Sequence, residues 1–376
     1  MACVTAAPKF VHDETKNGLI ADLIKAQGAA HAAAGQAHDA RKPTFEITPP
    51  ANTKDCRVLI IGATGYIGRF IAEASLASGR ITYVLSRPGP VSGSKAEAVR
   101  ELQAAGAVFL HGSMKDRDYM TKILRELKID VVISAVGGEC TLDQIELVDI
   151  IKCVGSVKRF LPSEFGHDID KTNPVEPALT MYSHKRKIRR AVEASGIPYT
   201  YICCNSIAAW PYYDKTNPSK VPPPLDCFNI YGDGNVKAYF VSGTDIGKFT
   251  MKTVDDPRTI NKTVHFRPPS NFLTVNELAS MWEKKIGRVL PRASIPESQL
   301  LRMAKEYPIP GCVVAALTHD IFINGCQFKF LIDGEVDEEA GLLYPDTPYQ
   351  TVDDCFDSFI VELVAGSKDG RIFPAA

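Results

Sequence analysis

Short hydrophobic runs alternate with segments of helical periodicity from residue 56 to about residue 205. Branched apolar residues without polar interruption are typical of strands that are buried on both faces of a parallel sheet. The apolar runs predict strands at 58–61, 81–85, 108–110, 131–134, 159–161 and 200–203. The periodic segments between them predict helices at 69–78, 96–105, 118–127, 142–153 and 183–194. This alternation predicts an α/β fold of the Rossmann type, a doubly wound parallel sheet with ligands at the carboxyl ends of its strands.

After residue 205 the pattern becomes irregular and rich in proline, which predicts a smaller C-terminal α/β lobe that covers a substrate. In this lobe we expect a strand pair within 228–241 that turns at Gly232-Asp233-Gly234, and helices at 245–253, 275–286 and 297–307. The predicted divisions are a disordered extension at 1–55 with at most a short helix at 19–27, a first domain at 56–205, a substrate lobe mainly at 206–363 and a flexible tail at 364–376.

Three glycines follow the first strand at the spacing G-x-x-G-x-x-G, and a helix follows them. Gly62 suits a tight turn, Gly65 lets the backbone approach a pyrophosphate, and Gly68 lets the helix pack closely on the strand. The N–H groups at the start of the helix would then point at the phosphates. A plain strand-to-helix turn is the alternative, but the flanking strand and helix favour a dinucleotide fingerprint. The predicted cofactor contacts in this turn are Gly62, Ala63, Thr64, Gly65, Tyr66, Ile67 and Gly68.

Arg87 stands at the end of the second strand, 25 positions after Gly62, where an enzyme that uses NAD usually has an acidic residue. A guanidinium binds a 2′-phosphate with two parallel N–H bonds and stacks on an adenine, whereas a carboxylate would repel the phosphate. Arg87 therefore predicts that the cofactor is NADP, as NADPH in a reductase. We place Lys95 in the same loop as a second positive charge, with simple exposure to solvent as the alternative.

The composition and charge exclude several classes of partner. The chain has 43 Lys and Arg against 44 Asp and Glu, so nothing points to nucleic acid or to a charged membrane surface. No apolar run approaches the roughly 18 residues that a membrane span needs. The ten cysteines form no C-x-x-C pair, which favours reduced thiols and a cytoplasmic location, and we predict no metal site. Asp13, Glu14 and Asp22 argue against an organellar transit peptide.

The loops at the carboxyl ends of the other strands are expected to complete the binding site. By position, the loop at 112–113 lies near the adenine, the loop at 135–138 lies on the nicotinamide side, and 162–167 follows the fifth strand. We expect Ser163 in the last loop to order the loop and the cofactor amide rather than to react, because no base sits at an activating spacing.

Lys185 opens a basic run on the helix that passes the nicotinamide end of the sheet, and Arg189 lies on the same helix face. Short-chain reductases of this fold pair a lysine with a tyrosine four positions earlier, but here position 181 is Met, and Tyr182 is only three positions before the lysine. Basic runs on helices usually face solvent, which is the alternative for Lys185.

Three segments, 159–168, 202–208 and 318–326, resemble the plant reductases of the isoflavone reductase-like group. This group belongs to the atypical short-chain dehydrogenases and includes leucoanthocyanidin, pinoresinol–lariciresinol and phenylcoumaran benzylic ether reductases. The resemblance covers residues 55–363, and Cys-Cys-Asn-Ser at 203–206 and Thr-His-Asp-Ile-Phe at 318–322 resemble the leucoanthocyanidin branch. The resemblance implies NADPH-dependent removal of the C4 hydroxyl of a flavan-3,4-diol, which gives a flavan-3-ol such as catechin. It also implies that Lys185 is the catalytic base, that His167 assists, and that Arg189 contacts the cofactor.

The absence of a tyrosine four positions before Lys185 fits this chemistry. A base that removes the phenolic proton para to C4 expels the C4 hydroxide and leaves a quinone methide, which accepts a hydride at C4. Lys185 must then be a neutral amine, with a pKa lowered by burial or by the neighbouring cations Arg186 and Arg189. We expect His167 to donate a proton to the departing hydroxyl, and its alternative role is to cap a nearby aspartate of its loop.

Tyr182, Asn205 and His319 are predicted to contact a polyphenol substrate, or else to be structural hydrogen-bonding residues. Two other functions stay open: a sibling reductase for an isoflavone or a lignan ether, and a non-catalytic regulator that senses NADP. A sensor needs the glycine turn and Arg87 but has no use for Lys185 together with a histidine. The oligomeric state, the accepted stereochemistry at C2 and C3, and the hydride face do not follow from the sequence.

Overall fold

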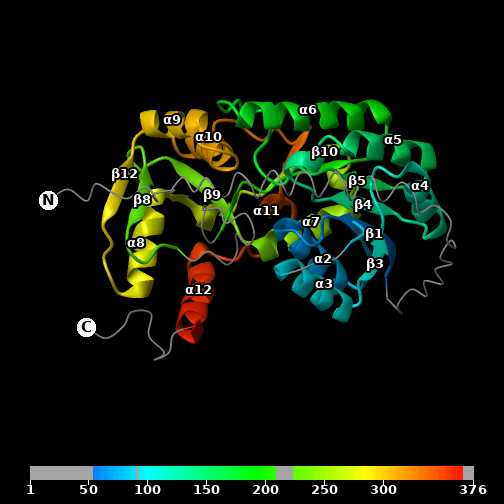
Figure 1. Cartoon of the computed structure of the whole chain (residues 1–376), viewed down its shortest axis with the longest axis horizontal. Coiled ribbons are helices and arrows are strands. Elements are labelled where there is room, and N and C mark those ends of the chain that lie inside the picture. Colours follow the sequence, from blue (N-terminus) through cyan, green and yellow to red (C-terminus); the bar gives the residue numbers. More distant parts are fainter. Residues whose placement is uncertain (1–53, 90–92, 209–222, 367–376) are drawn as a thin grey trace, which may run out of the picture. The chain divides into compact units, whose positions relative to one another are not determined.

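The computed structural model describes residues 54–89, 93–208 and 223–366 (Figure 1). The expected extension, except its last two residues, lies outside the described residues, and so do its short helix at 19–27 and the expected tail from residue 367 onward. Within the described ranges, no helix combines the length and the hydropathy that crossing a membrane requires.

Five parallel strands form the central sheet of the first domain, in the order β3-β2-β1-β4-β5. Every neighbouring pair in this sheet is parallel, which confirms the predicted doubly wound fold. The strands are β1 (Lys54–Ile61), β2 (Arg80–Ser86), β3 (Val108–His111), β4 (Val131–Ser134) and β5 (Arg159–Leu161). Val58, Leu59 and Ile60 are fully buried, as expected for a strand at the centre of a covered sheet.

Helices follow the strands in the predicted alternation. They are α2 (Tyr66–Ala77), α3 (Ser94–Ala104), α4 (Arg117–Glu126), α5 (Gln144–Val154) and α6 (Ala178–Ser195). Figure 1 shows α4, α5 and α6 on one side of the sheet and α2 and α3 on the other. α6 begins at Ala178, before the predicted residue 183, and its first turns bury Ala178 and Tyr182 at a spacing of four residues, as on one face of a helix.

The sheet continues beyond β5 into strands from later in the chain. A bridge between Phe160 and Tyr199 joins β5 to β6 (Thr200–Cys203), which pairs in parallel with β10 (Lys262–His265). β10 in turn pairs with β13 (Asp337–Glu339), and α7 (Gly243–Asp255) packs against α2. One hydrophobic core therefore joins Val58 and Ile60 to Phe249, Phe266 and Ala340. β10, from beyond the predicted boundary at 205, supplies the partner that β6 would lack as an edge strand.

The second lobe contains two small sheets and a hydrophobic core of its own. β8 (Phe228–Tyr231) pairs with β12 (Arg292–Ile295), and β9 (Lys237–Val241) lies between β7 (Ser206–Ile207) and β11 (Phe272–Thr274). The larger helices of the lobe are α8 (Val275–Ile286), α9 (Glu297–Glu306), α10 (Gly311–Phe322) and α12 (Val352–Gly366). Short helical turns are η1 (Gly138–Cys140), η3 (Pro257–Thr259), η4 (Pro269–Asn271) and α11 (Ala340–Leu343). The core of the lobe gathers Phe228, Phe240, Trp282 and Phe356.

The predicted pairing of β8 with β9 is wrong, although both strands and the turn between them exist. The N–H of Gly232 donates to the carbonyl of Ile295 at 2.9 Å, so β12 pairs with β8, while β7 and β11 pair with β9. The side-chain amide of Asn276, on α8, donates to the carbonyl of Asp233 at 2.9 Å and holds the connection against that helix. The glycine turn thus predicted the two strands but not their partners.

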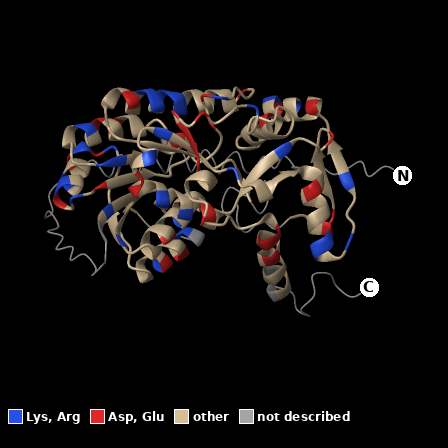
Figure 2. Ribbon diagram, turned by 180° about the vertical axis from the view of Figure 1, so that it is seen from behind, with Lys and Arg blue, Asp and Glu red and all other residues tan. Residues whose placement is uncertain are grey.

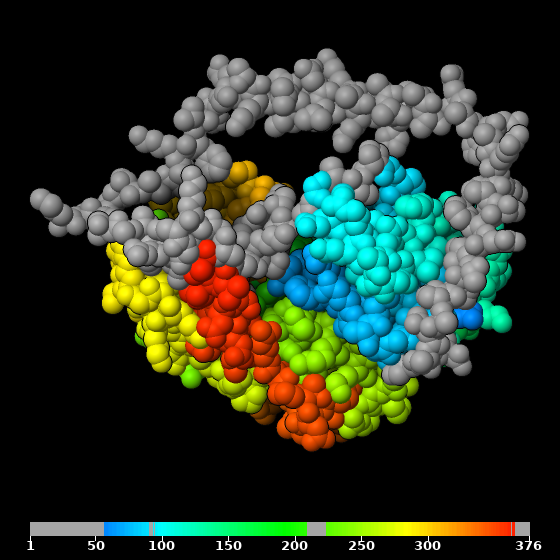
Figure 3. Space-filling model, turned by 90° about the horizontal axis from the view of Figure 1, so that it is seen from below, coloured from blue at the N-terminus to red at the C-terminus, as the bar shows by residue number. Residues whose placement is uncertain are grey.

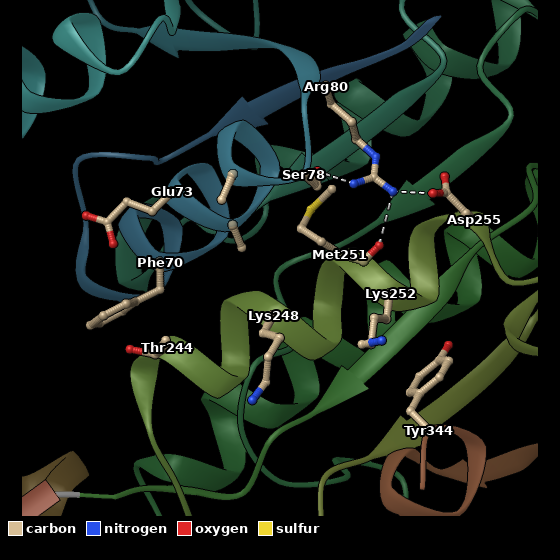
Figure 4. Close-up of a pocket in the computed structure, with 12 residues that line it drawn as sticks. Phe70, Glu73, Ser78, Arg80, Thr244, Lys248, Met251, Lys252, Asp255 and Tyr344 are labelled. Carbon is tan, nitrogen blue, oxygen red and sulfur yellow. Dashed lines mark hydrogen bonds and ion pairs between the residues drawn. The ribbon is translucent and has the colours of Figure 1, made fainter. Parts of the chain in front are cut away.

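A groove of about 660 Å³ lies between α2 and α7, away from the predicted site residues (Figure 4). Arg80 lies at one end, where it pairs with Asp255, and the other lining residues include Phe70, Lys248 and Tyr344. Figure 3 shows the face on which α2 (blue), α3 (cyan) and α12 (red) are seen. None of the predicted cofactor or catalytic residues lines this groove. The glycine turn of the predicted cofactor site lies instead at the carboxyl end of β1, where sheets of this type bind their ligands.

Candidate active site

The glycine turn after β1 has the geometry that the fingerprint predicts. Gly62 has a φ of +90°, and a Cβ on this residue would lie 2.6 Å from the carbonyl oxygen of Ala135. A Cβ on Gly68 would lie 2.2 Å from the carbonyl oxygen of Gly62, so the helix can approach the strand only with glycine at this position. α2 begins directly at Tyr66, and no side chain caps its N-terminus among the described residues. Its first N–H groups are therefore suited to an anion.

Arg87 lies at the same edge of the sheet as this turn. Ile61 and Leu85 are paired in the register of β1 and β2, so Gly62 and Arg87 follow them at the carboxyl ends of adjacent strands. The Arg87 side chain is exposed, as a group that binds an external phosphate must be. Lys95 is also exposed, but it lies in the first turn of α3 rather than in the predicted loop.

Ser163 orders two loops at the edge of the sheet, as predicted. Its hydroxyl donates to the carbonyl of Val136, and its N–H donates to the side-chain oxygen of Gln144 at 2.9 Å. The N–H of Ala135 donates to Ile61 at 2.8 Å, which ties the same region to β1. With its hydroxyl engaged by a carbonyl, Ser163 is not arranged as a nucleophile.

Lys185 meets the loop after β5. Its ammonium nitrogen donates to the carbonyl oxygen of Glu164 at 2.5 Å, and the residue is half-buried. Burial lowers the pKa of Lys185, and Arg189 acts in the same direction against the opposing carboxylate of Glu164. The expected contribution of Arg186 is absent, because its guanidinium is turned to the carbonyls of the loop, 2.7 Å from Ile169. The lowered pKa is what a lysine base requires.

His167 and Tyr182 form a buried pair, with Nδ1 of the histidine 2.7 Å from the phenol oxygen. Burial lowers the pKa of His167 from 6.5 to about 4, assisted by Lys185 and opposed by Asp320. Burial also raises the pKa of the Tyr182 phenol. His167 is therefore neutral near neutral pH. It does not take the alternative role of capping an aspartate of its loop, because its ring pairs with Tyr182 instead.

The guanidinium of Arg189 is held by carboxylates of the loop after β5, while the cofactor contact that the resemblance implies stays a prediction. Its guanidinium lies 2.8 Å from Glu164, 2.8 Å from Asp168 and 3.1 Å from Asp170, and it stacks over Tyr201. Arg189 is only 2% exposed, so its charge needs these carboxylates. The residue fastens the loop after β5 to α6, the helix whose basic residues are blue in Figure 2.

Asn205 and His319 have the hydrogen bonds of their structural alternative. Asn205 has a φ of +61°, and its side chain donates to the carbonyl of Phe266 at 2.8 Å. His319 places Nε2 2.9 Å from a carboxylate oxygen of Glu297, which links α10 to α9. Both side chains are thus engaged within the protein, whereas Tyr182 lies in the cluster with His167. Their contacts with a substrate stay predictions.

Sequence reasoning missed Gln327, which touches His167 from 160 positions away with a side-chain nitrogen 3.1 Å from the Nε2 of the histidine. The only sequence signal for Gln327 was its position directly after the segment 318–326.

In the part of the chain that the structure describes, two groups of His, Asp and Cys residues lie close enough to hold a metal ion, but their carboxylates already have partners. One group contains His167 with Asp320, and the other contains Asp168. Asp168 pairs with Arg189, and Asp320 accepts a hydrogen bond from Thr172 at 2.6 Å. Both carboxylates are therefore engaged within the protein.

Comparison with known proteins places this arrangement in a family. Residues 54–356 match the NmrA-like family. Leucoanthocyanidin reductase of Desmodium uncinatum is 59% identical over 86% of this chain and 85% of its own length. A phenylcoumaran benzylic ether reductase of Ginkgo biloba is 47% identical over 81% of this chain and 99% of its own length.

Solved structures agree with these sequences. The binary complex of leucoanthocyanidin reductase with NADPH from Vitis vinifera has a TM-score of 0.77 and 60% identity, over 81% of this chain and 99% of that chain. An isoflavone reductase has a TM-score of 0.73 and 38% identity, over 81% of this chain and 100% of that chain. The chain therefore belongs to the NmrA-like family and, within it, to the plant reductases that include leucoanthocyanidin, phenylcoumaran benzylic ether and isoflavone reductases.

Proposed function

We propose that this protein is an NADPH-dependent reductase that removes the C4 hydroxyl of a flavan-3,4-diol and gives a flavan-3-ol such as catechin. The observation that carries the proposal is the half-buried Lys185, whose pKa is lowered by burial, on the same helix as the Tyr182 that pairs with His167. The 59% identity to a leucoanthocyanidin reductase supports the choice of substrate, since the phenylcoumaran benzylic ether reductase reaches only 47%.

The residues at the carboxyl edge of the sheet fit NADPH. Gly62 and Gly68 leave the space that side chains would fill, and the start of α2 offers N–H groups to a pyrophosphate. Arg87, exposed beside this turn, suits a 2′-phosphate. When bound, NADPH supplies the hydride for C4.

Lys185 is proposed as the base for the phenolic proton. A neutral amine that donates one N–H to the carbonyl of Glu164 keeps its lone pair for a proton from elsewhere. Taking the proton of the phenol para to C4 pushes electron density through the ring, so the bond from C4 to the hydroxyl oxygen breaks and a quinone methide forms. His167 and Tyr182 are proposed to stand at the departing hydroxyl.

Two alternatives make different predictions. A sibling reductase for an isoflavone or a lignan ether would share the glycine turn and Arg87, so only a substrate panel separates it from our proposal. A sensor that binds NADP without turnover would gain nothing from a lysine whose pKa is lowered next to a neutral histidine.

A cytoplasmic location is also part of the proposal. All nine cysteines in the described ranges are free, which suits a reducing compartment. Microscopy of a fluorescent fusion of the full chain would test this location.

The test of the function is NADPH oxidation with a 2,3-trans flavan-3,4-diol, followed by absorbance, with the product identified by chromatography. We expect the wild type to form a flavan-3-ol and Lys185→Ala to lose about 100-fold or more in kcat while it still binds NADPH. Lys187→Ala is the matched control, because Lys187 is exposed on the same helix. Tight NADPH binding without turnover of the diol, but with turnover of an isoflavone or a lignan, would overturn the proposal in favour of a sibling activity.

A further inference from the structure

The loop after β5 bends sharply at Phe165, whose φ is +30°. In the part of the chain that the structure describes, four residues other than glycine have a positive φ, and Phe165 is the only aromatic one. A bulky side chain rarely adopts such a φ, because its Cβ then crowds the neighbouring carbonyl oxygen. A backbone conformation of this kind persists only where its surroundings fix it, and such positions cluster at functional sites.

Contacts on both sides of Phe165 hold this conformation. Its ring is half-buried and packs against the hydrophobic core that joins β1 to α7. On one side, the carbonyl of Gly166 accepts a hydrogen bond of 3.0 Å from the N–H of Asn205. On the other side, the carboxylate of Glu164 pairs with Arg189 at 2.8 Å. Phe165 is thus held between two neighbours that are fixed to other elements.

The bend sets the direction of the peptide group between Glu164 and Phe165. A peptide group is planar, so its carbonyl turns with only two backbone angles, the ψ of Glu164 and the φ of Phe165. Because Gly166 is held by Asn205, a negative φ at Phe165 would swing this carbonyl into another direction. In the observed conformation the carbonyl oxygen lies 2.5 Å from the Nζ of Lys185. The positive φ therefore directs the acceptor at the lysine.

We propose that Phe165 is a positioning residue: its left-handed backbone points the carbonyl of Glu164 at Lys185, and its packed ring holds the bend. The carbonyl accepts one N–H of the lysine, so the lone pair of the neutral amine keeps one direction. Phe165 acts only through this peptide group. That Lys185 is the base rests on the function proposed above, whereas the direction of the carbonyl does not.

A purely structural role for Phe165 and the proposed role rank two substitutions in opposite order. Phe165→Ala and Phe165→Gly both remove the ring, and glycine also adds freedom to the unfolded chain. If only packing matters, glycine is therefore the worse replacement. If the left-handed backbone matters, glycine is the better one, because it adopts a positive φ readily. A residue with a Cβ populates this conformation about tenfold less.

The first arm of the test observes the peptide group and needs no substrate. Glutamate is followed by phenylalanine only at 164–165, so carbonyl-labelled glutamate with nitrogen-labelled phenylalanine gives a single correlation in NMR of the NADPH-bound full chain. We expect the carbonyl shift of Glu164 to change in Lys185→Met, which removes the donor. Lys187→Met, at an exposed position of the same helix, should leave the shift unchanged. Equal shifts in the wild type and in Lys185→Met would overturn the proposal.

The second arm uses the diol. We expect the kcat of Phe165→Ala to lie about tenfold or more below that of Phe165→Gly. The limb of the pH–rate profile that reports Lys185 should move to lower pH in Phe165→Ala, because the charged lysine loses its acceptor. A mere loss of packing would not move this limb.

The titratable and charged groups that face Lys185 are the same in all variants at position 165. They come from the loop after β5, from α6 and from the end of β6, and they are Glu164, His167, Arg189, Cys203 and Cys204. A shift of the limb in Phe165→Ala alone would therefore report the carbonyl.

Lys128 is the matched control, because its φ is +51° and it lies exposed just after α4. Lys128→Gly should unfold at a higher temperature than Lys128→Ala, but both should keep the kcat and the pH profile of the wild type. A kcat of Phe165→Ala that equals or exceeds that of Phe165→Gly would contradict the proposal.

The two arms also separate the possible failures. If Phe165→Ala does not fold and Phe165→Gly does, the order is the one that we propose. If neither variant folds, the carbonyl signal of the wild type against Lys185→Met still decides. If the wild type does not turn over the diol, the proposed function fails, while the same signal still tests the direction of the peptide group.

Discussion

Lys185 and Glu164 are linked through the backbone, because the ammonium nitrogen of the lysine lies 2.5 Å from the carbonyl oxygen of the glutamate. The carboxylate of the same glutamate pairs with Arg189 at 2.8 Å, one helical turn further along α6. Glu164 thus presents its carbonyl to Lys185 and its carboxylate to Arg189. The position of the proposed base is therefore fixed by the loop after β5 as well as by its own helix.

The rate should depend on the protonation of Lys185. Burial lowers the pKa of this lysine from 10.5, and only the neutral amine can take a proton. We predict that kcat rises with pH to a plateau, with an apparent pKa below that of a free lysine, and a pH–rate profile with the diol measures it. Lys185→Arg should have no such limb and about 100-fold less activity, because arginine stays charged. A wild-type rate that falls over the same range would exclude the lysine as the base.

Arg189 should matter more for stability than for cofactor affinity. Its removal leaves Glu164 and Asp168 as buried carboxylates without their cation. We predict that Arg189→Met lowers the free energy of unfolding by about 3–5 kcal/mol, as measured by urea denaturation. NADPH titration of the folded variant should give a dissociation constant near that of the wild type. A strong loss of NADPH affinity at unchanged stability would support the cofactor role that the resemblance implied.

The sequence predicted the first domain well because its signals are local. Four branched residues mark β1, and the three glycines after it mark the turn, whose conformation at Gly62 follows from the backbone alone. The same logic failed for β8 and β9, since the turn at Gly232 carries no information on which strand comes to lie beside each. Strand partners distant in sequence are decided by packing.

The candidate site also combines residues that local sequence patterns reveal with properties that arise only when the chain folds. Lys185 stood out because a basic run on one helix is visible in the sequence, and Arg189 was visible for the same reason. The difference between them, a lowered pKa in one and three carboxylate partners in the other, arises only when the loop folds onto α6. Gln327 could not be found, because a glutamine has no distinctive chemistry until it meets His167.

Arg87 should decide between NADPH and NADH. Its guanidinium is exposed at the end of β2, so replacing it removes a phosphate partner without disturbing the core. We predict that Arg87→Ala weakens NADPH binding by about tenfold or more and leaves NADH binding nearly unchanged, as measured by fluorescence titration. Arg125→Ala, at an exposed position of α4, is the control. Equal losses for both cofactors would place Arg87 outside the 2′-phosphate site.

The glycine turn offers a comparison of two substitutions. Gly62→Ala combines a φ of +90° with a Cβ only 2.6 Å from the carbonyl oxygen of Ala135. We predict a loss of about 1–3 kcal/mol or more in stability together with loss of NADPH binding. Gly106→Ala, between α3 and β3, is the control, because its φ is +99° but its Cβ would meet nothing within 4 Å. Thermal denaturation and NADPH titration of both variants test whether the close approach to Ala135, rather than the positive φ alone, is responsible.

His167 should make stability depend on pH in a window of its own. Its pKa falls from 6.5 in the unfolded chain to about 4 in the folded protein, so the unfolded state binds more protons between these values. Stability is therefore complete above the higher pKa and is lost as the pH falls through the window, by roughly 3 kcal/mol in total. The carboxyl groups of Asp170 and Asp256, whose pKa values are lowered from 3.8, act only below this window.

Urea denaturation of the wild type and of His167→Gln across this range separates the histidine from the carboxylates. Both proteins should lose stability below about pH 4, where the paired carboxylates become protonated. Only the wild type should lose stability between the two pKa values of the histidine, because glutamine does not titrate. His167→Gln starts from a lower stability, but the comparison uses the slope with pH, which a uniform loss of packing leaves unchanged. Parallel slopes over the whole range would mean that folding leaves the pKa of His167 unchanged.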